Sequence, residues 1–369
     1  MNFLLAIGIG INISALTQLV QGTNLRMVST RIGVAILMLW IVRFGFVYIK
    51  FEPYAFDYPF LLLFDQSLLL LDGLLLWLYA RSLLKPIQFT WRILIHLLPF
   101  ILSTSIAVIN VTSYPEELAL ALRHSYEAFE KGQPLVSVDV VIFIVGLMVL
   151  NTGYLIFSIR EVRKYNYSLF FQFSNIERLK GNWVVTFQWL WMVFFILPVL
   201  LYFGNYLFPI LSMEMIGHVL ILSWVLLSVF FNANVIRQDY TTELEEVSSQ
   251  AAGSTSLTEE DQRLIAHLQS RMESQKFYQE DSLNLNQLAG YLEMKPVALT
   301  ELIKKTDYEN FYDLVNSYRV EAVKQALTKS KEQVIVLAYQ QGFNSKSTFN
   351  KIFKEKTGMT PREYRMSHK

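Results

Sequence analysis

Long apolar runs dominate the first two thirds of the chain. They cover residues 1–20 and about 28–50, 59–84, 92–111, 136–159, 184–206 and 214–234. At ~1.5 Å rise per residue, a helix over each run is long enough to cross a hydrocarbon core ~30 Å thick. The first run lacks a basic flank and a small-residue cleavage site, so we expect it to be retained. The pattern predicts seven transmembrane helices within residues 1–235.

The hydrophobic pattern changes after residue 235. Between residues 238 and 262 there are seven acidic and no basic side chains, a composition that cannot bury a core. Residues 236–256 are therefore predicted to be an acidic polar linker. From 257 to 369 apolar residues return at helical spacing, which predicts a separate helical domain. The expected fold class is all-α, with a seven-helix transmembrane bundle followed by this domain.

Lysine and arginine are unevenly distributed among the loops that connect the apolar runs. The first, third and fifth loops with their helix ends hold Arg26, Arg31, Arg81, Lys85, Arg92, Arg160, Arg163, Lys164, Arg178 and Lys180. The second, fourth and sixth hold only Lys50, Arg123 and Lys131. Because Lys and Arg concentrate on the cytoplasmic side, we expect the N-terminus outside and the C-terminal domain in the cytoplasm. The predicted location is the cytoplasmic (inner) membrane, as a multi-pass protein.

The stretch from 334 to 364 has the pattern of a helix, a tight turn and a second helix. Gly342 is expected to supply the positive φ of the turn, and Ser345 to cap the second helix. That helix has an apolar stripe formed by Phe349, Ile352 and Phe353. The stretch therefore predicts a helix-turn-helix unit at the C-terminus.

A second unit of the same kind is predicted upstream. Its supporting helix has apolar positions at Leu283, Leu285, Leu288, Ala289 and Leu292. The turn covers residues 293–295, and Pro296 opens the next helix at its first position, where proline is favoured. A long helix from about Phe311 to Leu327 connects the two units. Two such units on one connector would enter successive major grooves, ~34 Å apart.

Positive charge gathers at the end of the chain, although the whole chain carries a net charge of only +1. Residues 346–369 contain seven Lys or Arg against two acidic residues. The polar face of the last helix-turn-helix is predicted to present Lys346, Ser347, Asn350, Lys351 and Lys354. Such a face can reach base edges while nearby cations hold phosphates. Charge alone, however, favours an ordinary solvated helix face.

The local sequence resembles the C-terminal signature of the AraC family of transcription regulators, LAxxxGFxSxSxFxxxFKxxxGxTPxxYR. The matching positions are Leu337, Ala338, Gly342, Phe343, Ser345, Ser347, Phe349, Phe353, Lys354, Gly358, Thr360, Pro361, Tyr364 and Arg365. Many matches at fixed spacing are a specific signal. The resemblance extends back to about Leu283. It implies that residues 257–369 bind double-stranded DNA.

The resemblance also implies which residues contact DNA. Base contacts are expected from Val297, Thr300 and Glu301 in the first unit, and from Lys346, Ser347, Thr348, Asn350 and Lys351 in the second. Lysine can donate to guanine and asparagine can pair with adenine. Glu301 departs from the family, which often carries a basic or amide residue there. Phosphate contacts are expected from Lys304, Lys305, Lys354 and Arg362.

Polar and charged side chains also occur inside the apolar runs. They are Arg43, Asp65, Asp72, Asp139, Asn151 and His218. Counted from the outer ends of their helices, Arg43 and Asp65 lie at one depth, ~10 Å below the surface, and are predicted to form an ion pair. Asp72 and Asn151 are predicted to form a second layer near the midplane. We take these four residues as sensor candidates, with plain contacts between helices as the equal alternative.

Several chemistries lack a signal in this sequence. The chain has no cysteine, and we find no nucleotide-binding loop, kinase motif, HExxH zinc motif or nucleophile elbow. We therefore expect no enzyme activity, no cofactor and no metal. The favoured function is a membrane-anchored one-component transcription regulator, with duplex DNA, the lipid bilayer, a small ligand or membrane partner, and a second copy of the chain as partners. The alternative is a transporter or channel with a regulatory helix-turn-helix tail.

Overall fold

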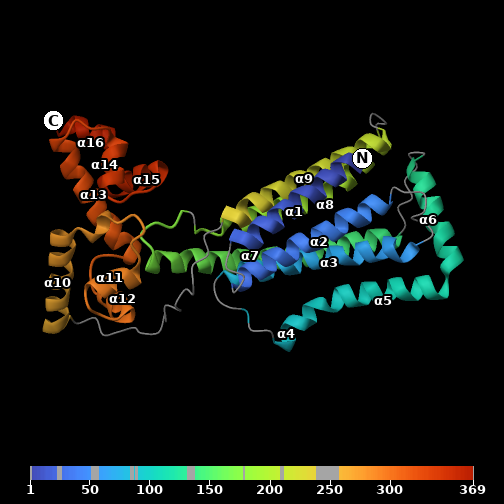
Figure 1. Cartoon of the computed structure of the whole chain (residues 1–369), viewed down its shortest axis with the longest axis horizontal. Coiled ribbons are helices and arrows are strands. Elements are labelled where there is room, and N and C mark those ends of the chain that lie inside the picture. The colour runs from blue at the N-terminus through green and yellow to red at the C-terminus, as the bar shows by residue number, and fades with distance from the viewer. Residues whose placement is uncertain are drawn as a thin grey trace. The chain divides into compact units, whose positions relative to one another are not determined.

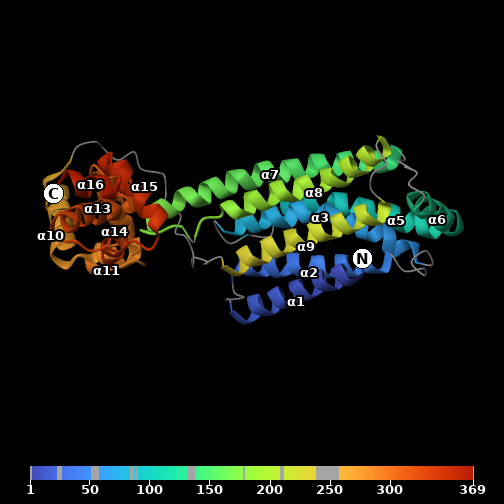
Figure 2. The ribbon, with the colours of Figure 1, turned by 90° about the horizontal axis from the view of Figure 1, so that it is seen from above.

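The computed structural model describes residues 2–22, 27–50, 58–83, 87, 90–130, 138–177, 179–207, 212–237 and 257–368. The described chain is built from helices, which confirms the predicted all-α fold (Figures 1 and 2). It forms two compact units. The first comprises Met1–Arg163 with Gly181–Glu243, and the second comprises Lys164–Lys180 with Leu244–Lys369. Most of the predicted linker, from residue 238 to 256, lies outside the described residues.

The first unit contains the apolar helices. They are α1 (Asn2–Gly22), α2 (Val28–Lys50), α3 (Pro59–Ser82), α4 (Trp91–Leu94) with the 3-10 turn Ile95–Leu97 and α5 (Leu98–Ser113), α7 (Val138–Gln172) as far as Arg163, α8 (Asn182–Leu207) and α9 (Met213–Arg237). The helix α6 (Pro115–Glu130) follows α5. In both views α1, α2, α3, α8 and α9 run side by side (Figures 1 and 2). A helix therefore covers each of the seven predicted runs.

Some of these helices are long and apolar enough to cross a membrane, and one is shorter. Among the described residues, six helical stretches are long and apolar enough to cross a membrane, namely 2–21, 28–50, 59–82, 91–113, 141–172 and 215–237. The apolar part of α8, Asn182–Pro198, is shorter. The count of seven spans stays a prediction.

Aromatic rings fill much of the core of the first unit. Trp40 of α2 packs against Phe187 and Trp191 of α8, with ring centroids 5.6 and 5.5 Å apart, and against Phe231 of α9 at 4.9 Å. Offset and edge-on ring pairs of this kind stabilise a core beyond the area that they bury. The aromatic side chains therefore tie α2, α8 and α9 together.

The second unit is the helical domain predicted after the linker. Its helices are α10 (Glu259–Gln275), α11 (Leu285–Tyr291), α12 (Pro296–Lys304), α13 (Phe311–Lys329), α14 (Val334–Gln340), α15 (Lys346–Thr357) and α16 (Pro361–Ser367), with a 3-10 turn at Phe277–Gln279. Thr258, Asn284, Asn310, Ser345 and Thr360 each cap a following helix with a side-chain oxygen. The predicted cap at Ser345 is confirmed.

The long helix α13 supports two separate hydrophobic cores. Leu314 and Val315, near its start, pack with the side chains of α10, α11 and α12. Val323 and Leu327, nearer its end, pack with α14, with Phe343 of the following turn, and with Phe349 and Phe353 of α15. The first head, α11–α12, and the second head, α14–α15, are thus two helix-turn-helix units carried by one helix.

Candidate nucleic-acid interface

The two turns of the helix-turn-helix units use the left-handed backbone region differently. Gly342 has φ 87°, as predicted from the sequence. A Cβ at this position would collide with the Tyr278 carbonyl oxygen and lie 2.9 Å from that of Gln279, so only glycine fits. In the first head the left-handed residue is Glu293, with φ 56°. A side chain there costs ~1–2 kcal/mol of backbone strain, and the sequence contained no glycine to reveal it.

The exposed face of α15 agrees with the predicted one at four of its five base-contact positions. Lys346, Ser347, Asn350 and Lys351 are exposed, as is Lys354 one turn further on. Thr348 is wrongly placed by the sequence analysis, because it is buried, with only 7% exposed. It lies four residues before Ile352 on the core face, and its backbone N–H donates to Ser345 Oγ at 3.4 Å. Thr348 is therefore a capping and packing residue.

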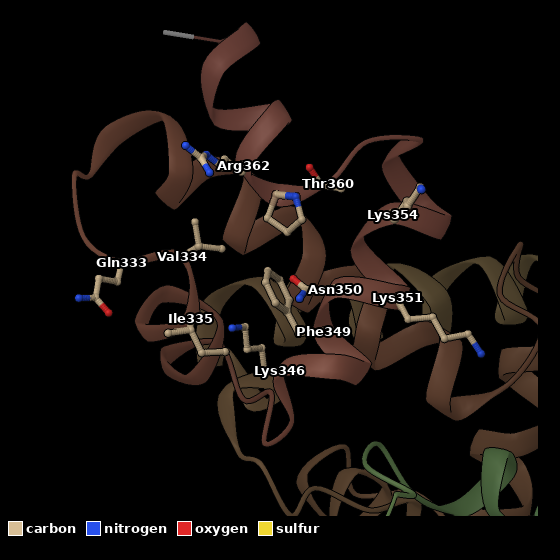
Figure 3. A pocket seen from close by; sticks show the side chains of 11 residues that line it. Gln333, Val334, Ile335, Lys346, Phe349, Asn350, Lys351, Lys354, Thr360 and Arg362 are labelled. Carbon is tan, nitrogen blue, oxygen red and sulfur yellow. The ribbon is translucent and has the colours of Figure 1, made fainter.

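A groove of about 650 Å³ runs beside α15. Lys346, Asn350 and Lys354 line it from one face of α15, at a spacing of four residues. Thr360 and Arg362 line it from the start of α16 (Figure 3). Together with Lys351, the groove therefore brings four cations and the Asn350 amide from two helices to one surface. Of these residues, Lys354 and Arg362 are the expected phosphate contacts, and Lys346, Asn350 and Lys351 are expected base contacts.

The charges of α15 are only partly neutralised. Lys351 Nζ lies 3.8 Å from Glu355 on the same helix, an exposed pair of little energetic weight. Within the described part of the chain, no carboxylate oxygen lies within 4 Å of a charged nitrogen of Lys346, Lys354 or Arg362. Amide and ammonium groups on an exposed helix face are suited to base edges and phosphates. The second head thus offers a cationic surface to an anionic partner.

The first head has a different charge balance. On α12, Val297 is 63% exposed, and Glu301 forms an ion pair with Lys304 at 2.8 Å. Thr300 is half-buried and donates its hydroxyl to the Pro296 carbonyl at 3.1 Å. The face of α12 therefore carries the predicted residues but little net positive charge.

Lys305, at the end of the first head, is held by α10. Its Nζ lies 2.8 Å from Asp261. The hydrogen bond from Lys305, followed by those from Thr258, lowers the pKa of Asp261 to about 2. Lys305 was expected to hold a phosphate, and in this structure its charge is matched by the Asp261 carboxylate.

Sequence reasoning missed Arg319, which is fully buried in α13. Its Nε donates to the Tyr278 carbonyl at 2.7 Å, and its Nη2 donates to the Glu280 carbonyl at 2.8 Å. Burial lowers the pKa of Arg319 to about 10, so it stays protonated at neutral pH. The available signal was its spacing of four residues from Val315 and from Val323, which places it on the apolar stripe.

The sensor candidates lie together in the first unit. Arg43 Nε is 3.5 Å from Asp65 Oδ1, so the predicted pair is present. Asp65 also accepts a hydrogen bond from Lys50 at 2.7 Å, a partner that the sequence analysis had treated only as a helix end. The guanidinium of Arg43 also lies over the ring of Trp224, 4.9 Å from its centroid. The predicted ion pair is thus part of a larger group.

Asp72 is not in a layer apart from that pair, which corrects the prediction from depth. Its carboxylate accepts hydrogen bonds from Arg43 Nη1 at 2.6 Å and from Trp40 Nε1 at 3.1 Å. Asn151 donates to the Leu147 carbonyl at 2.8 Å and lies against Gly73. The long arginine side chain reaches across the two predicted layers, which a count of residues along each helix cannot show. A role of these four residues in sensing stays a prediction.

Comparison with known proteins finds a family model that matches part of the second unit. Residues 288–367 match the family model of a helix-turn-helix domain. Two uncharacterized HTH-type transcriptional regulators, from Staphylococcus aureus strains COL and N315, are each 32% identical over 85 residues. The match covers 23% of this chain and 11% of the length of each relative.

A solved structure also matches part of the chain. It is a protein with unknown function from Listeria innocua, 30% identical in sequence, and the match covers 28% of this chain and 97% of that one with a TM-score of 0.26. The sequence signature at 337–365, the two helix-turn-helix units and the matching family model agree. The C-terminal part of the chain is an AraC-type helix-turn-helix domain.

Proposed function

We propose that this chain is a membrane-anchored transcription regulator, in which the second unit binds duplex DNA sequence-specifically and the first unit receives the signal. The observation that carries the proposal is the exposed face of α15, with Lys346, Asn350 and Lys354 on one surface of an AraC-type helix-turn-helix. Related chains are named as HTH-type transcriptional regulators, which supports the same role for this one.

Side-chain chemistry indicates which residues of α15 would contact bases and which would contact phosphates. Asn350 has both a donor and an acceptor for adenine, and Lys351 can donate to guanine. Lys354 and Arg362, which also line the groove, are suited to phosphate oxygens, which position the duplex without reading it. The second head therefore supplies most of the sequence information. The first head, whose Glu301–Lys304 pair is internally neutral, contributes less phosphate attraction.

Membrane anchoring is supported by the six apolar helical stretches. The excess of Lys and Arg in alternate loops supports a cytoplasmic second unit. We propose that Arg43, Asp65, Asp72 and Asn151 form part of the signal-receiving region, because charged groups in an apolar bundle are costly and mark functional sites. A ligand and a second copy of the chain are further proposed partners.

The experiment is selection of DNA by the full chain. The protein is reconstituted in lipid vesicles, incubated with sheared genomic DNA, and recovered by flotation so that only vesicle-bound fragments are sequenced. We expect a few promoter fragments to be enriched, and the enrichment to weaken as salt rises, because binding releases counterions from phosphates. Protein-free vesicles are the control. Recovery of bulk DNA without enrichment would contradict sequence-specific binding, and loss of the protein from the floating layer would contradict anchoring.

A further inference from the structure

The segment Lys164–Lys180 belongs to the second unit, although it lies between α7 and α8 in the sequence. We call these residues the 164–180 segment. It contains the last turns of α7, which ends at Gln172, and the irregular residues that follow. Its partners within the unit are more than 100 positions later in the chain, as for Ser174 and Leu283. The contacts are therefore tertiary ones.

Ser174 is fully buried in these contacts, and its polar groups are satisfied. Its hydroxyl and its backbone N–H both donate to the Leu283 carbonyl, at 2.6 and 3.2 Å. Its carbonyl accepts from Arg319 Nη1 at 3.2 Å and from Asn316 Nδ2 at 3.3 Å. Arg319 Nη2 also donates to Ser174 Oγ at 3.1 Å. The buried Arg319 guanidinium thus makes two of its hydrogen bonds to Ser174, so the contact satisfies buried polar groups on both sides.

Asn175 joins the residues before α11 to the turn of the second head through one side-chain amide. Its Nδ2 donates to the carbonyl of Asp281, which precedes α11, and to that of Gly342 at 3.2 Å. Gly342 lies in the turn of the second head, packed against Tyr278. The 164–180 segment thus contacts the place where both heads and α13 meet.

Aromatic residues of the segment pack beside these hydrogen bonds. Phe170 meets Tyr312 of α13 edge-on, with ring centroids 5.1 Å apart. Phe171 adjoins Thr300 and Lys304 of α12, with a void of only 10 Å³ between them and the start of α13. Thr300 and Lys304 are two of the predicted DNA contacts of the first head. The segment therefore lies against the flank of the face with which α12 would read DNA.

We propose that the 164–180 segment is an intramolecular ligand of the DNA-binding unit, and that its docking competes with duplex DNA at the first head. The proposal rests on the function proposed above. A reading helix enters a major groove ~12 Å wide, with a phosphate strand along each flank. Phe171 and the end of α7 occupy one of these flanks. DNA engaged by α12 and the docked segment therefore exclude each other.

The position of the segment in the chain suggests how a signal could control this competition. The segment continues α7 from Lys164 and leads directly into α8, which begins at Asn182. A signal that displaces either helix would pull on Ser174 and Asn175 and release the first head. Linkage requires the converse, so DNA that engages the first head must weaken docking by the same factor.

A disulfide across the docking contact tests the proposal on the full chain. Phe173 and Asn284 are directly opposite each other in an antiparallel bridge. Residues paired in this way have Cα atoms ~4.5–5.5 Å apart, which is within the range that a disulfide spans. Because the natural chain has no cysteine, Phe173→Cys with Asn284→Cys introduces the only two thiols. The control pair, Ser168→Cys with Asn284→Cys, moves one thiol ~7.5 Å back along α7 and should not close.

Each variant is reconstituted in vesicles, and its affinity for the DNA fragment that the parent chain enriches is measured in the oxidised and in the reduced form. We expect the 173–284 disulfide to form without DNA and to lower the affinity for DNA at least ~10-fold. In a footprint of the same fragment, the DNA contacted by the first head should no longer be protected. Reduction of the 173–284 disulfide should raise the affinity to that of the Ser168→Cys, Asn284→Cys control pair. Absence of the disulfide would overturn docking. A locked protein that binds as tightly as the reduced one, or more tightly, would overturn competition.

A milder variant guards against misfolding caused by the cysteines. Asn175→Ala removes the amide that joins Asp281 to Gly342, and we expect it to raise DNA affinity by weakening docking. The matched control is Lys180→Gln, whose ammonium pairs with Glu177 inside the segment at 3.0 Å. Equal affinities for the two variants would contradict the competition. If no form prefers any fragment, the proposed function and the competition fail together, while disulfide formation alone still decides docking.

Discussion

Arg43 of α2 and Asp72 of α3 form the shortest ion pair of the charged group in the first unit, with Nη1 and Oδ2 2.6 Å apart. Both side chains are almost fully buried. Trp40 donates to the second oxygen of Asp72, and Lys50 neutralises Asp65. Two cations therefore face two carboxylates in an apolar bundle, which satisfies charges that would be costly alone.

Removal of Arg43 should destabilise the first unit strongly. Arg43→Met leaves Asp72 buried without its cation, and loss of one member of a buried pair costs ~3–5 kcal/mol. Lys50→Met is the control, because the Lys50 side chain is 29% exposed and its loss should cost clearly less. Thermal unfolding of both variants in the same detergent, followed by intrinsic tryptophan fluorescence, measures the difference. Equal losses would show that Arg43 is not the centre of the group.

Gly342 should tolerate alanine less well than Gly358 does. Both have positive φ, 87° and 75°, so alanine strains the backbone at either position by ~1–2 kcal/mol. Only at Gly342 does the added Cβ also meet the Tyr278 carbonyl, whereas nothing lies within 4 Å at Gly358. We expect Gly342→Ala to lower the urea midpoint of the second unit more than Gly358→Ala does. The reverse order would contradict the packing described at the turn.

The residues of α15 should separate into two classes when replaced. Asn350→Ala or Lys351→Ala should relax base preference at one position, at a cost of ~1–3 kcal/mol. Lys354→Ala should weaken binding to all sequences alike and reduce the salt slope by ~1. Binding to a library of single-base variants of the enriched fragment measures both effects. Identical profiles for the three variants would mean that the faces are misassigned.

Asp261 should make the second unit sensitive to acid. Its pKa in the folded state, about 2, is below the ordinary value because Lys305 and Thr258 donate to the ionised form. The stabilisation is therefore present above the unfolded pKa of ~3.9 and is lost as pH falls towards about 2. Unfolding curves of the parent and of Asp261→Asn should differ at neutral pH and converge in acid. A constant difference over this range would contradict the assignment.

Features set by local pattern could be predicted from the sequence. The apolar runs, the cap at Ser345 and the turn at Gly342 depend on residues within a few positions of one another, and the helices formed where these signals indicated. Thr348 was misplaced because a polar side chain at the first turn of a helix can either face solvent or pack under its cap. The side-chain type did not distinguish the two.

Long-range partners could not be predicted in the same way. Arg319 and Ser174 are 145 positions apart, and neither type of residue indicates the other. Periodicity places Arg319 on the apolar stripe of α13 but leaves its partner open. Likewise, depth along α2 and α3 matched Arg43 with Asp65, while the reach of the guanidinium decided its shortest contact, with Asp72.

A hydroxyl-radical footprint of the vesicle-reconstituted chain on its enriched DNA fragment tests the central claim most directly. Two heads on α13 should protect two stretches on one face of the duplex, about one helical turn or ~34 Å apart. The second head should give the stronger protection, because its face carries the cations Lys346, Lys354 and Arg362. A footprint that matches this spacing supports sequence-specific DNA binding by the second unit. No footprint, or uniform protection along the fragment, would contradict it.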